Sequence, residues 1–302
     1  MEVLLRLSAL LVVLLVGTGL RASGILNASR TDRLNAVAYY VALPALIFVS
    51  TYDQAIGELL SLELIGGLLI VFFATAGIAW IVHRNKADSG RQSVAIVQSY
   101  HSNLGYLGLP LVAATFADPV TAIASVILGV VTLVQVPLTI VVLSTANGAD
   151  AELAEELRGL AANPVLVSLL VGLTIGSLGI TFPGTAVVGL DAIGSLALPL
   201  ALLCVGASLE VDLPSIDYGA TGSVVAVKII AMPLLAWVVF STLAVDTATF
   251  AASVVMLGTP TAVSTYVFAA QLEGDEEFAS LNVFTTTLAS IVTLFVLITL
   301  IT

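Results

Sequence analysis

Apolar runs of about twenty residues recur along the whole of this 302-residue chain. A hydrocarbon core of about 30 Å needs roughly 20 apolar residues for one helical crossing, and each run has about that length. Charges, glycines and prolines separate ten such runs. Their approximate ranges are 3–20, 33–51, 62–82, 93–116, 119–144, 164–180, 188–209, 218–243, 248–271 and 278–301. The sequence therefore predicts an all-α membrane protein with ten transmembrane helices.

The composition excludes several other classes of protein. Charged residues make up 10% of the chain, whereas about a quarter is usual in soluble domains, so too little polar surface exists for a water-soluble fold. The chain has only 9 Lys and Arg residues but 20 Asp and Glu residues, and this excess of negative charge argues against nucleic acid as a partner. Cys204 is the only cysteine, which excludes a disulfide framework and a cysteine metal site. We expect neither a metal nor a cofactor.

The distribution of basic residues predicts the orientation in the membrane. Loops after the first, third and fifth runs share one side, and they hold seven of the nine Lys and Arg residues: Arg21, Arg30, Arg33, Arg84, Lys86, Arg91 and Arg158. Loops on the other side carry Asp and Glu but no Lys or Arg, and Arg6 near the N-terminus is the exception to this pattern. Because short cytoplasmic loops are enriched in Lys and Arg, we expect a multi-pass protein of the plasma membrane with both termini extracytoplasmic. A cleaved signal peptide is the alternative reading of the first run, although a clean cleavage site is lacking.

An internal repeat is the next inference. The polar linker 145–163 separates residues 1–144 from residues 164–302, with five runs on each side. Since five is odd, two related halves would be inverted in the membrane, an arrangement typical of secondary transporters. Matching features occur in the same order in both halves: LPALIF in the second run and LPLALL in the seventh, then Ser102 aligned with Pro260 in the fourth and ninth. We therefore expect two inverted five-helix repeats.

The fourth and ninth runs contain the predicted substrate site. Ser102, Asn103 and Gly105 interrupt one run, and Thr259, Pro260 and Thr261 interrupt the other, each near the bilayer centre. Proline lacks an N–H and clashes with the preceding turn, and non-helical backbone inside a membrane must line a cavity or be buried in protein. Two broken helices at equal depth favour a site for an anion at the helix ends. Simple proline kinks repaired by Ser and Thr are the alternative.

Three further polar side chains lie inside the runs: His101, Gln135 and Lys228. A charge buried in a membrane is costly and usually functional, so Lys228 is expected to bind a substrate carboxylate, pair with an acid or transfer a proton. Snorkelling of its long stem to the interface is the structural alternative. His101 is interpreted as a hydrogen-bonding side chain or a carrier of a coupling proton. Gln135 is expected either to bond across helices or to take part in coupling or charge-pairing with His101 and Lys228.

Four motifs together resemble the auxin efflux carrier family of membrane transporters. They are LNAVAYYVALPALIF (34–48), NLGYLGLPL (103–111), NPVLVSLLVGL (163–173) and ALPLALLCVGASL (197–209). The resemblance covers nearly the whole chain. It implies broken crossover helices 4 and 9, a scaffold domain of spans 1, 2, 6 and 7, and a transport domain of spans 3–5 and 8–10. It also implies dimers formed through the scaffold.

The resemblance also bears on function. Members carry organic anions such as indole-3-acetate, malate and malonate, so the substrate is expected to be a small organic anion moved by alternating access. Asn103 and Pro260 match the family's crossover residues. Ser102 stands where plant auxin exporters have proline, which puts auxin itself in doubt. The alternatives are a sodium-coupled symporter of the bile-acid type, an ion or proton antiporter and, more distantly, an intramembrane enzyme. H⁺ or Na⁺ as a coupling ion is left open.

Overall fold

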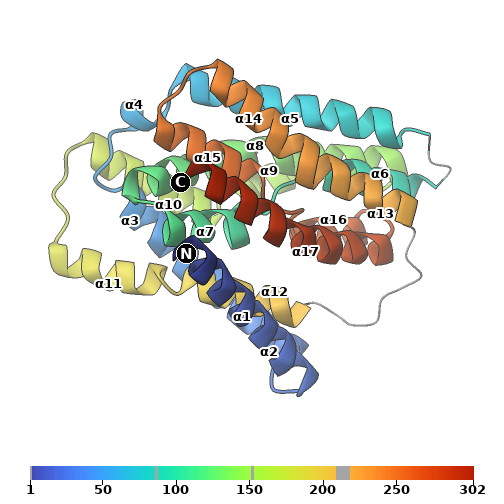
Figure 1. The fold of residues 1–302 in the computed structure, drawn as a ribbon, viewed down its shortest axis with the longest axis horizontal. Helices are drawn as coiled ribbons and strands as arrows, with labels where there is room; N and C mark the ends of the chain where they lie inside the picture. The colour runs from blue at the N-terminus through green and yellow to red at the C-terminus, as the bar shows by residue number, and fades with distance from the viewer. Residues whose placement is uncertain (1, 86–87, 151–152, 209–217) are drawn as a thin grey trace. The chain divides into compact units, whose positions relative to one another are not determined.

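The computed structural model describes residues 2–85, 88–150, 153–208 and 218–302, and all named elements in these ranges are helices (Figure 1). Lys86, one of the seven basic residues that predict the orientation in the membrane, lies outside the described residues. The chain divides into two compact units. Unit 1 comprises Met1–Ser61, Gly105–Gly129 and Ala161–Val211. Unit 2 comprises Leu62–Leu104, Val130–Leu160 and Asp212–Thr302.

Helices of the two units alternate along the chain. Unit 1 contains α1 (Glu2–Ala22), α2 (Ala28–Val37), η1 (Ala38–Ala42), α3 (Leu43–Thr51), α4 (Ile56–Leu59), α7 (Leu109–Thr115), α10 (Pro164–Ser177), α11 (Gly184–Gly194) and α12 (Ala197–Ser208). Unit 2 contains α5 (Leu62–His83), α6 (Ser89–Tyr100), α13 (Tyr218–Val225), η3 (Ala226–Ala231), α14 (Met232–Thr242), α15 (Thr247–Leu257), α16 (Ser264–Gln271) and α17 (Glu276–Ile301). Three elements have residues in both units: η2 (Leu104–Gly108), α8 (Asp118–Asn147) and α9 (Leu153–Ala161).

The helix lengths fit a protein that crosses a membrane several times. Six helical stretches are long and apolar enough for a crossing: Ala28–Thr51, Leu62–His83, Asp118–Asn147, Gly184–Ala207, Gly219–Thr242 and Glu276–Ile301. Four shorter apolar helices accompany them among the described residues: Val12–Ala22, Leu104–Thr115, Pro164–Ser177 and Thr247–Leu257. The fourth and ninth predicted spans fall in the second group because each is interrupted near its middle.

Three π-helical segments each end two residues before a proline. η1 precedes Pro44, η2 precedes Pro110 and η3 precedes Pro233. A proline inside a helix lacks an N–H and clashes with the carbonyl four residues earlier. Wider turns avoid that carbonyl: the N–H of Leu43 donates to the carbonyl of Ala38, and the N–H of Met232 donates to that of Val227. The chain thus passes these prolines with its helices locally widened.

In unit 1, α1 packs closely on α12 through two glycines. A Cβ at Gly17 would overlap the carbonyl oxygen of Leu203, and a Cβ at Gly206 would overlap that of Leu14. The Thr18 hydroxyl donates to the carbonyl of Gly206 at 2.9 Å. Small residues at a helix interface in a membrane let the two backbones approach, which increases van der Waals contact.

In unit 2, α5 and α14 run side by side (Figure 1). A Cβ at Gly67 would lie 2.8 Å from the ring of Phe240, so this contact also depends on a glycine. Both Gly67 and Phe240 are buried.

Aspartates cap the two helices that lead into the predicted site. Asp88 accepts from the N–H groups of Gly90 and Arg91 at the start of α6. Asp246 accepts from the N–H groups of Ala248 and Thr249 at the start of α15. Such caps satisfy N–H groups that have no partner within the helix. They explain why both helices begin where the polar loops end.

The Asp246 cap predicts a pH-dependent contribution to stability. Burial raises the pKa of its carboxyl, but bonds from the Thr249 hydroxyl and from the two N–H groups outweigh burial, so the pKa lies below its ordinary value. A lowered pKa stabilises the fold above the unfolded pKa of about 3.9, and this stability is lost as the pH falls through the folded pKa. Asp246→Ala should therefore cost about 1 kcal/mol at neutral pH, and less below about pH 4. Thermal unfolding in detergent at both pH values measures this. Asp53→Ala, at an exposed aspartate that caps no helix, is the control; a pH-independent cost for Asp246→Ala would contradict the assignment.

Candidate functional site

Two helix ends in unit 2 meet in an antiparallel crossing. α6 ends at Tyr100 and α15 ends at Leu257. The backbone of His101 is extended directly after α6, whereas Gly258 and Thr259 form a turn after α15 before the chain reaches Pro260. Ser102 pairs with Thr261 in an antiparallel bridge. The N–H of Asn103 donates to the carbonyl of Pro260 at 2.9 Å, and the N–H of Ala262 donates to that of His101 at 3.1 Å. The two predicted interruptions therefore satisfy each other's backbone groups.

The end of α15 is determined by its local sequence. Pro260 has no N–H with which to continue the helix. Thr259 instead closes the last turn, since its hydroxyl donates to the carbonyl of Met256 at 2.8 Å. Thr259, Pro260 and Thr261 are all buried. Unwinding thus leaves their polar groups inside the protein, where each needs a partner.

Side chains from two long helices occupy the outer edges of the crossing. Gln135 of α8 accepts from the N–H of Ser102 at 3.1 Å and donates to its carbonyl at 3.2 Å. On the other segment, the N–H of Thr261 donates to the hydroxyl of Thr286 in α17 at 3.4 Å. The Gln135 amide therefore makes both hydrogen bonds that a neighbouring β-strand would make with the backbone of Ser102.

Lys228 reaches the crossing from η3. Its side chain is fully buried, and its Nζ lies 2.7 Å from the hydroxyl of Ser102, 3.1 Å from the sulfur of Met232 and 3.1 Å from the carbonyl of Leu257. Leu257 is the last residue of α15, so the ammonium also lies at the negative end of that helix. The ammonium thus binds three neutral groups at the crossing.

His101 is 1% exposed and lies beside the crossing. Its Nδ1 lies 2.8 Å from the hydroxyl of Thr139 in α8. The same hydroxyl is 3.4 Å from that of Tyr100. His101 therefore ties the end of α6 to α8.

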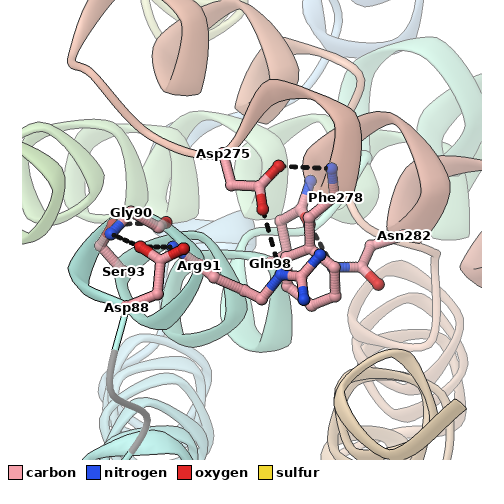
Figure 2. A network of polar contacts seen from close by, with 8 residues as sticks. All are labelled: Asp88, Gly90, Arg91, Ser93, Gln98, Asp275, Phe278 and Asn282. Atoms are coloured by element: carbon pink, nitrogen blue, oxygen red, sulfur yellow. Dashed lines mark hydrogen bonds and ion pairs between the residues drawn. The ribbon is translucent and has the colours of Figure 1, made fainter. Parts of the chain in front are cut away.

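A buried amide network supports α6 just before the crossing (Figure 2). Asn282 of α17 donates to the side-chain oxygen of Gln98 at 2.8 Å. Gln98 in turn donates to the hydroxyl of Thr265 in α16 and to the carbonyl of Ala279 in α17. One glutamine thus ties α6 to both of the helices that follow the second interruption.

An ion pair joins the beginnings of α6 and α17 (Figure 2). The Nε of Arg91 donates to a carboxylate oxygen of Asp275 at 3.0 Å, and the guanidinium lies over the ring of Phe278. The other Asp275 oxygen accepts from the N–H of Phe278. These contacts fix the two helices at the end remote from the crossing.

The structure places every predicted site residue except Gly105 in unit 2: Ser102, Asn103, Thr259, Pro260, Thr261, His101, Gln135 and Lys228. Gly105 belongs to unit 1, where an added Cβ would make only ordinary contacts with Leu43 and Leu128. Within the described ranges, no three His, Cys, Asp or Glu side chains are grouped to hold a metal ion.

Four partners of the site were missed from the sequence: Thr139, Thr286, the sulfur of Met232 and the carbonyl of Leu257. Threonines are frequent in these helices and usually bond their own backbone, so neither stood out. Met232 was recoverable, because it lies four residues after Lys228 and therefore on the same side of a helix.

Comparison of the sequence with known proteins identifies a matching family model and two relatives. The family model described as "Membrane transport protein" matches the chain twice, over residues 3–156 and 152–298. An "Uncharacterized transporter" of Methanothermobacter thermautotrophicus is 25% identical over 288 residues, which cover 95% of this chain and 94% of that protein. A Rhizobium meliloti protein named "Putative malonate transporter" is 25% identical over 270 residues, covering 86% of this chain and 83% of that protein.

Proposed function

Because the chain belongs to the membrane transport protein family, the auxin efflux carrier family that its motifs resemble, we propose that it carries a small organic anion across the plasma membrane by alternating access. The antiparallel crossing of Ser102 and Thr261 is the observation that carries this proposal. Helices broken at membrane depth are typical of the substrate sites of secondary transporters. The substrate would contact Ser102, Asn103, Thr259, Pro260 and Thr261 of unit 2.

The proposed layout has ten spans in two inverted repeats. The five apolar runs on either side of the polar linker 145–163 support it, because an odd number of spans inverts the second half. The helices that lead into the crossing also begin alike, with Asp88 capping α6 and Asp246 capping α15. The polar linker 145–163 would lie in the cytoplasm and both termini outside. A reporter that is active only in the cytoplasm, fused after Thr302, should be inactive.

The proposed division of labour assigns spans 1, 2, 6 and 7 to a scaffold and the others to a transport domain. The grouping of α1, α2, α3, α10, α11 and α12 in unit 1 supports the scaffold assignment. Gly105–Gly129 also groups with unit 1, although we assign spans 4 and 5 to the transport domain. We further propose that two copies pair through the scaffold.

The substrate class follows from the family and from the relative named for malonate. We propose a monocarboxylate or dicarboxylate of small size. Whether transport is coupled to H⁺ or Na⁺ is tested by the same binding experiment. Binding of a panel of acids (acetate, malate, malonate and indole-3-acetate) to the purified full chain, with and without Na⁺ and at two pH values, identifies both substrate and coupling ion. Binding that requires Na⁺ would favour a sodium symporter of the bile-acid type. No binding to any acid would overturn the proposal.

Two substitutions test the location of the site. Asn103→Ala and Pro260→Ala should each lower uptake of the acid that binds best into vesicles by about 10-fold, the loss expected for about 1.4 kcal/mol of binding. The matched control is Val267→Ala in α16, whose side chain is 46% exposed. Unchanged uptake in both test variants would overturn the site assignment while leaving the transport function intact.

A further inference from the structure

Lys228 is the only buried Lys, Arg, Asp or Glu side chain in the part of the chain that the structure describes. The groups that its Nζ contacts, Ser102, Met232 and Leu257, are all neutral. A buried ammonium without an anion keeps much of its desolvation cost, because neutral dipoles compensate for lost water incompletely. A positive charge on Lys228 would therefore be uncompensated at the crossing in the empty protein.

An unpaired hydroxyl lies on the same side of the crossing. Ser102 and Thr261 are directly opposite each other in the bridge, and the N–H groups and carbonyls of the flanking residues make its hydrogen bonds. In such a pair the two side chains point to the same side and lie close together. The hydroxyl of Ser102 binds Lys228, whereas the hydroxyl of Thr261 is fully buried and has no hydrogen-bond partner among the described residues.

Together these groups match one carboxylate. We propose that the ammonium of Lys228 is the counter-charge for a single carboxylate of the transported anion, with the hydroxyls of Ser102 and Thr261 as additional donors. Hydrogen bonds between charged partners are roughly twice as strong as neutral ones, so the carboxylate would displace the weaker contact with sulfur. This inference rests on the proposed function, because it names the residue that recognises the charge of the substrate.

The charge count narrows the proposed substrate class from monocarboxylates and dicarboxylates to singly charged acids. One ammonium balances one carboxylate, and a second carboxylate would enter a site without a second buried Lys or Arg among the described residues. An uncompensated charge in a low-dielectric site is strongly disfavoured. The site therefore selects singly charged carboxylates, and takes a dicarboxylate only with its second carboxyl protonated or esterified.

Three forms of one carbon skeleton test this selection. Malonate, monomethyl malonate and dimethyl malonate carry two, one and no negative charges at about pH 7, well above ordinary carboxyl pKa values. The wild-type chain should bind the monoester at least about 10-fold more tightly than malonate, and the diester not measurably. Equal or tighter binding of malonate than of the monoester would overturn the charge count.

Lys228→Gln separates a counter-charge from a structural role. Glutamine keeps a donor for the carbonyl of Leu257 but removes the charge, so a purely structural Lys228 would be largely replaced by it. We expect binding of the monoester to weaken about 10- to 100-fold, the range for losing a hydrogen bond to a charged group, while the unfolding temperature changes little. Lys228→Met is the second variant, because an apolar side chain of similar length removes the cost of burying a charge.

The outcomes distinguish the two proposals. Ile230→Met, in the same segment but 53% exposed, should bind as wild type does. If wild type binds acids of the panel and both Lys228 variants bind them equally well, the role of Lys228 is overturned and the transport function stands. If folded wild type binds none of the acids, the transport function itself is overturned.

Discussion

Gln135→Met should destabilise the protein by about 2 to 4 kcal/mol and abolish transport. The Gln135 amide is the partner of the buried N–H of Ser102 and one of two partners of its carbonyl, the other being the N–H of Leu104. A buried donor left without a partner costs about 1 to 3 kcal/mol, and the lost bond to the carbonyl adds about 1. Methionine has a similar volume, so the loss is one of hydrogen bonds rather than of packing.

Thermal unfolding in detergent and uptake into vesicles measure the two effects of Gln135→Met. Leu133→Ala is the control, because Leu133 lies on the same helix and is 55% exposed. A Gln135→Met protein that unfolds at the wild-type temperature and transports normally would show that the crossing does not depend on this amide. Normal stability with lost transport would instead assign Gln135 to the substrate.

Gly17→Ala should cost about 1 to 3 kcal/mol, which is a large effect for one methyl group. Its Cβ would overlap the carbonyl oxygen of Leu203 and lie 3.0 Å from the Cα of that residue. Both are backbone atoms, so no side chain can rotate away. The expected result is a lower unfolding temperature in detergent, caused by displacement of α1 from α12.

Gly19→Ala provides a matched control on the same helix. Nothing lies within 4 Å of a Cβ at Gly19, and alanine favours a helix over glycine by up to about 1 kcal/mol. Gly19→Ala should therefore be neutral or stabilising. If both alanine variants lower the unfolding temperature equally, the close contact of α1 with α12 is not the cause.

The positions of the helices could be predicted from the sequence, because apolar length and aspartate caps act locally. The helix expected over 62–82 is α5 (Leu62–His83), and that expected over 119–144 is α8 (Asp118–Asn147). The interruption of the fourth and ninth predicted spans is confirmed, since α6 ends at Tyr100 and α15 at Leu257. Polar residues and proline mark these points in the sequence itself.

The partners across the crossing could not be predicted, because they depend on residues far apart in the chain. Ser102 receives the ammonium of Lys228, which is 126 residues away, and the amide of Gln135, which is 33 residues away. The carbonyl of Leu257 became a ligand of Lys228 only because α15 ends there. A backbone acceptor has no signature in the amino-acid sequence. The roles of these residues in transport stay predictions.

The widened turn of η3 also governs where Lys228 points. In an α-helix each residue advances the chain by about 100° around the axis, and a π segment contains one residue more than an α turn would hold. The regular spacing of side chains by about 100° around the helix axis is therefore interrupted between α13 and α14. Lys228 lies in η3, the segment where this interruption occurs. Removing a single residue between Ala226 and Ala231 would close the widened turn to an α turn and change the direction in which residue 228 points. The direction of the buried ammonium is thus set by a residue count and not only by the identity of the side chain.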